Sequence, residues 1–144
     1  MCIRDRLKTE HRLAQALFEA GLKTKDHETG RRTLILAHLA YALLKHGVQE
    51  ETVIYPALRE MGNGGTAKEL AAEHFDIKTY LHELAESPKD DPKWIKTWRA
   101  FYNLVQEHIV EEEEKVFPAF HGKMSDKENA HLTRAMNREG IKLA

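Results

Sequence analysis

Two stretches of the chain share an unusual pattern, and they constrain the fold more than any other feature. Residues 46–58 read HGVQEETVIYPAL and residues 108–120 read HIVEEEEKVFPAF. Aligned without a gap, they share a histidine, a Glu-Glu pair beginning four residues later, and a Pro-Ala pair. Positions four residues apart lie on one face of an α-helix. Each stretch therefore predicts an imidazole and a carboxylate side by side on a helix.

Turn and capping signals divide the chain into helical segments. They predict helices over about residues 3–22, 26–61, 66–86 and 92–120, and a short fifth helix after residue 125. Asp26 and Asp91 are predicted N-caps, and the TAKE sequence at 66–69 is a predicted capping box, as is the segment from Ser125 to Glu128. The prolines of the repeated stretches, Pro56 and Pro118, are predicted to kink or end their helices.

The pattern of apolar residues indicates the fold class. No strand-like alternation of useful length occurs, and each long segment carries an apolar stripe of helical period. Short connectors between four such segments favour an all-α, up-and-down antiparallel four-helix bundle, with the short fifth helix at the C-terminus. A chain of 144 residues, 42% of them hydrophobic, suits a single domain over residues 1–144.

Charge and cysteine content exclude several classes of protein. Lys plus Arg (22) nearly balance Asp plus Glu (23), so no strong field attracts nucleic acid or an anionic membrane. No apolar run is long enough for a membrane span, and the start MCIRDRLK is too charged for a signal peptide, which predicts a cytoplasmic protein. Cys2 is the only cysteine, so any metal in the body of the chain needs nitrogen and oxygen ligands.

The first six residues, MCIRDR, resemble the translation of a transposase adapter used in sequencing libraries. We hypothesise that residues 1–6 are partly artefactual and that the natural protein begins further upstream. Recovery of the same codons from unamplified source DNA would contradict this hypothesis. No functional role is assigned to Cys2.

Titratable residues interrupt the apolar stripes of the second and fourth long helices. The predicted stripe of the second helix is Leu39, Leu43, His46, Glu50, Val53, Ile54 and Ala57. The predicted stripe of the fourth helix is Phe101, Leu104, His108, Glu112, Val116 and Ala119. An uncompensated carboxylate or imidazole in a bundle interior costs several kcal/mol. A compensating partner is therefore expected.

The other two long helices also point a histidine inward, His11 on the first and His74 on the third. Imidazole and carboxylate ligands without thiolate suit iron, manganese or zinc. Six ligands exceed a four-coordinate zinc site but fit two metals bridged by carboxylates. In this arrangement Glu50 and Glu112 bridge the metals, the histidines bind terminally, and oxo, hydroxo or small-molecule ligands occupy the open positions.

These motifs carry a family resemblance. The order His11, His46-x3-Glu50, His74, His108-x3-Glu112, with YPAL and FPAF after the acids, resembles the hemerythrin-like (HHE cation-binding) family over about residues 6–122. The resemblance implies a four-helix bundle with a non-haem, oxo-bridged di-iron centre. Oxygen-carrying members have H-x3-H on the third helix and an aspartate on the fourth. Here Lys78 follows His74, and Glu112 takes the place of the aspartate.

The ligand pattern is similar to that of the bacterial H, H-x3-E, H, H-x3-E branch, which is associated with iron binding, peroxide decomposition and responses to oxygen or nitric oxide. Two functions follow as hypotheses. One is a protein that binds or senses oxygen or nitric oxide, or that stores iron. The other is a small di-iron enzyme that decomposes peroxide or activates oxygen, which the missing fifth histidine favours slightly. A metal-free structural bundle is the third alternative, and the sequence leaves the oligomeric state open.

The remaining titratable and aromatic residues receive simpler interpretations. Glu51 or Glu73 is a candidate for orienting a ligating imidazole. The acids beside the bridging pair are otherwise expected to form a solvated face, namely Glu51, Glu111, Glu113 and Glu114. The histidines expected outside the site are His27, His38, His82, His121 and His131. The aromatic residues expected in the core are Trp94, Trp98, Phe101 and Tyr102.

Overall fold

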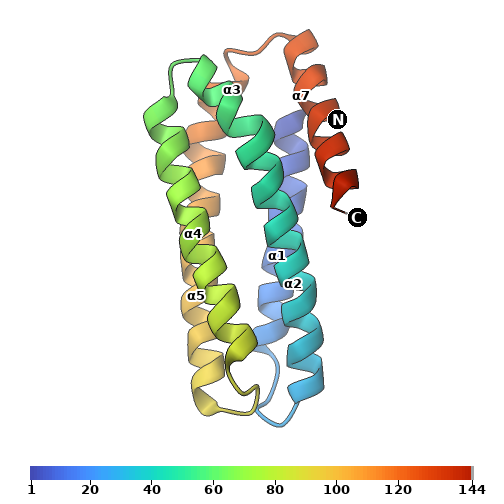
Figure 1. Ribbon diagram of the computed structural model, residues 1–144, viewed down its shortest axis with the longest axis vertical. Coiled ribbons are helices and arrows are strands. Elements are labelled where there is room, and N and C mark those ends of the chain that lie inside the picture. The colour runs from blue at the N-terminus through green and yellow to red at the C-terminus, as the bar shows by residue number, and fades with distance from the viewer. Residues whose placement is uncertain (144) are drawn as a thin grey trace.

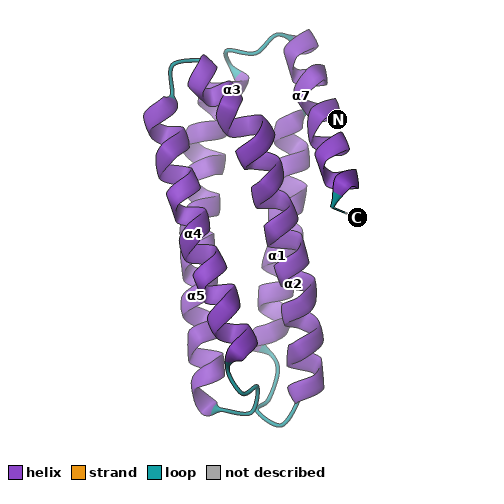
Figure 2. Ribbon diagram, in the orientation of Figure 1, coloured by secondary structure: helices purple, strands orange, loops and turns teal. Residues whose placement is uncertain are grey.

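The computed structural model describes residues 1–143, and this range contains helices and connecting loops but no strand (Figure 2). The long helices are α1 (Ile3–Leu22), α2 (Thr29–Gln49), α4 (Gly64–Glu86) and α5 (Pro92–Glu111). They form an up-and-down antiparallel four-helix bundle in which α1 and α4 each contact both α2 and α5 (Figure 1). The all-α fold prediction is confirmed. Assignment of residues 1–144 to a single domain stays a prediction.

The C-terminal helix α7 (Asp126–Lys142) lies outside the bundle, beside α1 and α2 (Figure 1). It begins with the predicted capping box, in which Ser125 Oγ accepts from the Glu128 N–H and Glu128 Oε2 accepts from the Ser125 N–H. The Gln49 side chain of α2 donates to the Met136 carbonyl at 2.8 Å and ties α7 to the bundle. Within residues 1–143, no helix combines the length and apolar character needed to cross a membrane.

Two of the predicted helix starts differ from the structure. Asp91 caps α5 as predicted, by accepting from the Lys93 N–H at 2.8 Å. Asp26 does not cap α2, because its carboxylate accepts from the buried Arg32 guanidinium at 3.0 Å and the helix begins at Thr29. The TAKE capping box is also wrong, since α4 already begins at Gly64 and has no side-chain cap.

The second and fourth long helices each contain one wide turn, directly at the repeated stretches. The π-helical segment η1 (Glu50–Ile54) connects α2 to α3 (Tyr55–Glu60), and η2 (Glu112–Val116) connects α5 to α6 (Phe117–His121). In each, a backbone N–H donates to a carbonyl five residues earlier, from Tyr55 to Glu50 and from Phe117 to Glu112. The alternative that the prolines end their helices is therefore wrong, and the irregularity at each stretch is a π-turn just before the proline.

The prolines explain why the wide turns occur where they do. Pro56 and Pro118 come directly after the i+5 hydrogen bonds. A proline has no N–H, and its ring clashes with the carbonyl four residues earlier in a regular α-helix. A π-turn widens the helix and relieves this clash. The helical path then continues past both prolines.

The π-turn also changes which residues face the core after it. Ala119 was expected on the buried stripe of the fourth helix, but it is exposed, and Phe117 and Phe120 are buried instead. Each π-turn contains an additional residue, so the helix beyond it is rotated relative to an uninterrupted α-helix. The expected stripe is correct before η2 and shifted after it.

Two separate apolar clusters form the core. One lies near α7 and contains Leu7, Val53, Leu70, Val116 and their neighbours. The other lies towards the opposite end and includes Ala14, Leu39, Ile77, Val105 and the aromatic residues Trp94, Trp98 and Phe101, with Tyr102 partly buried against them. These aromatic residues pack as core, as predicted. Five of the six predicted metal ligands lie in sequence between the two clusters on their helices, and His108 lies between Val105 and Ile109 of the second cluster. A polar layer therefore separates the halves of the core.

Candidate metal centre

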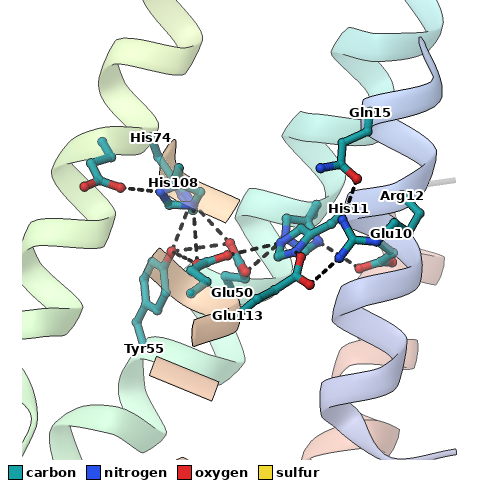
Figure 3. Close-up of polar contacts among 12 residues, drawn as sticks. Glu10, His11, Arg12, Gln15, Glu50, Tyr55, His74, His108 and Glu113 are labelled. Atoms are coloured by element: carbon teal, nitrogen blue, oxygen red, sulfur yellow. Dashed lines mark hydrogen bonds and ion pairs between the residues drawn. The ribbon is translucent and has the colours of Figure 1, made fainter. Parts of the chain in front are cut away.

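The structure brings all six predicted ligand residues together in this polar layer. Figure 3 labels four of them, His11, Glu50, His74 and His108. His11 comes from α1, His74 from α4, and the two His-x3-Glu pairs come from α2 with η1 and from α5 with η2. The four imidazoles are buried, and the Glu50 and Glu112 carboxylates are 0% exposed. Buried charge of this kind requires compensation from partners or a bound cation.

The Glu50 and Glu112 carboxylates each lie between two pairs of imidazoles, His11–His46 and His74–His108. Glu50 Oε1 lies 3.0 Å from His46 Nε2, and Glu50 Oε2 lies 3.2 Å from His74 Nε2. Glu112 Oε2 lies 3.1 Å from His11 Nε2, and Glu112 Oε1 lies 3.3 Å from His108 Nε2. One oxygen of each carboxylate therefore points to the His11–His46 pair and the other to the His74–His108 pair. Two carboxylates in this position have the geometry to bridge two cations.

Several of these close contacts are not hydrogen bonds. Glu50 Oε1, Glu112 Oε2 and His108 Nε2 are buried and have no hydrogen-bond partner, although a nitrogen or oxygen lies within 3.3 Å of each. The His11 and His46 Nε2 atoms are also only 3.1 Å apart. Buried polar atoms that converge without hydrogen-bond partners are expected around a cation. The donor set divides into two groups, His11, His46, Glu50 and Glu112 in one, and Glu50, His74 and His108 in the other. These residues fit a metal centre.

The outer nitrogen of every imidazole donates to a second carboxylate. The pairs are His46 Nδ1 with Glu10 at 2.9 Å, His74 Nδ1 with Glu51 at 2.8 Å, His11 Nδ1 with Glu113 at 3.0 Å, and His108 Nδ1 with Glu73. The acids come from α1 (Glu10), η1 after α2 (Glu51), α4 (Glu73) and η2 after α5 (Glu113). Each orients a histidine of the next long helix, and Glu113 returns to α1. A carboxylate at Nδ1 keeps the proton there and leaves the Nε2 lone pair facing the centre.

Sequence reasoning found two of these four orienting acids. Glu51 and Glu73 were candidates, and the structure confirms that both orient an imidazole. Glu10 was missed, and Glu113 was wrongly expected on a solvated face, whereas its side chain is only 11% exposed. A repeated signal was present in the sequence, since Glu10 and Glu73 directly precede His11 and His74, and Glu51 and Glu113 directly follow Glu50 and Glu112.

Three of the orienting acids also contact a cation nearer the surface. Arg12 pairs with Glu113, Arg6 lies 3.6 Å from Glu10, and Lys78 lies 3.6 Å from Glu51. The arrangement is thus layered from surface cation to acid to imidazole. The Arg12, Glu113 and His11 part of this arrangement is visible in Figure 3.

Tyr55 is a residue of the centre that the sequence analysis missed. Its hydroxyl oxygen lies 3.1 Å from His74 Nε2, 3.3 Å from Glu50 Oε2 and 3.2 Å from Glu112 Oε1 (Figure 3). The π-turn places Tyr55 there, because it puts residue i+5 beside residue i. The matching residue of the second stretch is Phe117, which stacks on His11 and brings no oxygen.

Charge compensation inside the layer shifts several pKa values. Burial lowers the pKa of His108, but the Glu112 and Glu73 carboxylates together outweigh burial and raise this pKa to about 10. Burial also lowers the pKa of His46, but the nearby carboxylates, Glu50 first among them, hold this pKa well above its usual value. Burial would raise the pKa of Glu50, but His46 holds it well below its usual value. Burial, followed by the two carboxylates, raises the pKa of Tyr55, which therefore stays protonated.

The other histidines lie away from the centre. All five are exposed, in agreement with the prediction, namely His27, His38, His82, His121 and His131. Glu114 is exposed as expected, and Glu111 is half-buried. None of these side chains contributes to the two donor groups.

Comparison with known proteins identifies the family of this chain. The profile of the hemerythrin HHE cation binding domain matches residues 2–120. The chain belongs to this hemerythrin family. The hemerythrin-like domain thus accounts for the bundle, and together with the clustered His and Glu side chains it makes this a metal-binding, hemerythrin-like protein.

Two individual proteins are similar to this hemerythrin-like chain. A hemerythrin HHE cation binding domain-containing protein from Mycobacterium kansasii superposes with a TM-score of 0.86 at 23% identity, over 99% of this chain and 87% of the other. A DNA nickase from Nostoc sp. strain PCC 7120 is 23% identical over 128 residues, which cover 89% of this chain and 36% of the relative. The chain thus matches about a third of the length of this curated relative.

Proposed function

We propose that this hemerythrin-like protein holds a non-haem di-iron centre, bridged by carboxylates and an oxo or hydroxo group, that binds or reacts with oxygen, peroxide or nitric oxide. His11 and His46 would bind one iron, and His74 and His108 the other. Glu50 and Glu112 would bridge the two. Helix-borne histidine and carboxylate ligands facing a bundle interior are an established way of building such sites.

The observation that carries the proposal is the position of the two carboxylates. Each has one oxygen within 3.3 Å of an imidazole on either side of the layer. A single cation would not use both carboxylates in this way, because the two imidazole pairs lie on opposite sides of them. Nitrogen and oxygen donors without thiolate favour iron or manganese over a closed zinc site.

The chain's own residues supply the environment of the centre. The four orienting acids hold the imidazoles with Nε2 inward, and the two apolar clusters exclude water from both sides of the layer. The protonated Tyr55 hydroxyl lies within hydrogen-bond distance of both carboxylates, can donate to either one, and is a further oxygen donor within reach of the same centre. When bound, the iron pair would supply redox change and open coordination positions for a small ligand.

The test is reconstitution with ferrous iron under anaerobic conditions, followed by metal analysis and visible spectroscopy before and after oxygen, nitric oxide and hydrogen peroxide. We expect about two irons per chain and charge-transfer bands of a bridged iron pair. A chain that takes up no iron, or that takes up zinc at one ion per chain in preference, would overturn the proposal.

A second candidate is a small di-iron enzyme that decomposes peroxide. The Tyr55 hydroxyl favours it, because a buried proton donor beside the bridging carboxylates is of no use for simple iron storage. Catalytic oxygen evolution from hydrogen peroxide would support the enzyme, whereas reversible spectra without turnover would support the binding or sensing protein.

A further inference from the structure

A small cavity lies directly against the imidazoles. Its volume is about 30 Å³, and its wall includes all four ligand histidines and the apolar side chains of Val105 and Ile109. A cavity of this size holds a water molecule or a ligand of two or three atoms. The cavity is therefore the place from which a small ligand would meet the candidate centre.

The cavity approaches solvent between α2 and α4. Of the residues in its wall, Leu44 on α2 and Lys78 on α4 are exposed, Leu44 by 42% and the Lys78 side chain by 50%, whereas Val105 is only 1% exposed. Gly47, also in the wall, lies one turn after Leu44, and a Cβ atom there would stand 3.3 Å from His74 Nδ1. The glycine thus leaves the seam between these helices free of a side chain. Leu44 and Lys78 lie where the cavity meets solvent, and this opening is called the mouth of the cavity.

Lys78 is the cation at this mouth, and it forms an ion pair with Glu51 at 3.6 Å. The Glu51 carboxylate also accepts from His74 and is not part of the cavity wall. Glu10 is the other charged residue of the wall outside the histidines, and it is engaged by His46 and Arg6. Lys78 carries its charge on a flexible stem, so the ammonium can follow a ligand from solvent to the mouth.

We propose that small ligands reach the centre through the seam between α2 and α4, and that Lys78 selects small monoanions, such as azide, nitrite or superoxide, over neutral diatomic molecules. This inference rests on the proposed function. It makes Lys78 a specificity-determining residue at the position where oxygen-carrying hemerythrins have a fifth histidine. A cation at a narrow mouth concentrates anions and accelerates their association, more strongly at low ionic strength.

The first test compares the association rates of azide and nitric oxide with the iron-loaded protein, at equal iron content. Lys78→Met should slow the association of azide about tenfold at low ionic strength and leave the association rate of nitric oxide unchanged. Lys78→Arg should retain the wild-type association rate of azide. Lys68→Met, exposed on the same helix and outside the cavity wall, is the matched control. An unchanged azide rate in Lys78→Met, or an equal slowing of both ligands, would overturn the role of the charge.

The second test addresses the route itself. Leu44→Trp should slow azide and nitric oxide alike, because it closes the mouth, whereas Leu34→Trp, exposed on the same helix but outside the cavity wall, should slow neither. Unchanged rates in Leu44→Trp would overturn the route.

A third measurement needs no metal and therefore separates this inference from the proposed function. Dissolved oxygen is paramagnetic and enhances the relaxation of methyl groups it reaches. In the metal-free protein, the methyl groups of Val105 should relax faster under oxygen than those of Leu39, which is equally buried but outside the cavity wall. Equal relaxation would overturn access to the cavity. If the protein fails to take up iron but this difference is seen, the proposed function fails and the cavity route stands.

Discussion

Tyr55 and Phe117 stand at matching positions of the two repeated stretches, but only Tyr55 brings an oxygen to the centre, 3.1 Å from His74 Nε2. The two halves of the site are therefore not equivalent. The His74–His108 half has a phenol beside it, and the His11–His46 half has the Phe117 ring stacked on His11. We therefore expect ligand binding, or a change of oxidation state, to differ between the two halves of the site.

Replacing Tyr55 by phenylalanine tests this difference. Tyr55→Phe makes the first stretch like the second and removes only the hydroxyl, so folding and iron uptake should persist. We expect the visible spectrum of the iron-loaded protein and its rate of reaction with peroxide to change, the rate by about tenfold or more. The matched control is Tyr80→Phe, because Tyr80 stacks on Phe101 in the apolar core away from the centre. Identical spectra and rates in Tyr55→Phe and wild type would contradict a role for the phenol.

Replacing the bridging carboxylates tests the two-metal arrangement. Glu50→Gln and Glu112→Gln each leave one bridge, and we expect iron content to fall below about one per chain in the double variant. Glu114→Gln, exposed on the same helix as Glu112, should retain the wild-type content. Elemental analysis after reconstitution gives the ratio. Full iron content in the double variant would show that the ligands lie elsewhere.

The orienting acids should affect metal affinity without contacting the metal. Loss of a carboxylate at the outer nitrogen of a ligating imidazole commonly lowers metal affinity about 10–100-fold. Glu73→Gln should weaken the metal held by His74 and His108, and Glu10→Gln the metal held by His11 and His46. Competition with a chelator measures both, and Glu69→Gln, exposed on α4, is the control. Affinities that match the control in both variants would contradict the orienting role.

The metal-free protein should lose stability as pH rises. The pKa of His108 is raised from 6.5 to about 10, so its stabilising contribution is complete below about pH 6.5 and is lost as the pH climbs towards 10. His46, whose pKa is also raised, acts in the same direction. Glu50, whose pKa is lowered, stabilises the fold above its usual pKa and loses this effect as the pH falls through its depressed pKa.

Thermal unfolding of the metal-free protein between pH 6 and 10 measures this effect, with the metal-loaded protein as the comparison. Metal binding requires unprotonated imidazole nitrogen at the centre, so loading should release protons and affinity should rise with pH. An unfolding temperature that stays constant or rises over this range in the metal-free protein would contradict the predicted sign.

Much of the fold and all six candidate ligands followed from local periodicity. His46 and Glu50 repeat at the helical spacing within an apolar stripe, and this spacing depends only on backbone geometry, so it can be read directly from the chain. The orienting role of Glu10 could not be read in this way. It acts on His46, on a different helix, and only the packing of α1 against α2 brings the two within 2.9 Å.

The helices, the bundle and the residue types that face its interior could be predicted from the sequence, because these depend on period, capping and burial. How those residues work together depends on the packing of the helices. The π-turns at Glu50 and Glu112 bring Tyr55 into the centre and turn Ala119 out of the core, and a proline signal alone does not distinguish a wide turn from a helix end. The partner of each imidazole likewise depends on which helices are neighbours, which is a property of the packed bundle and not of any one segment.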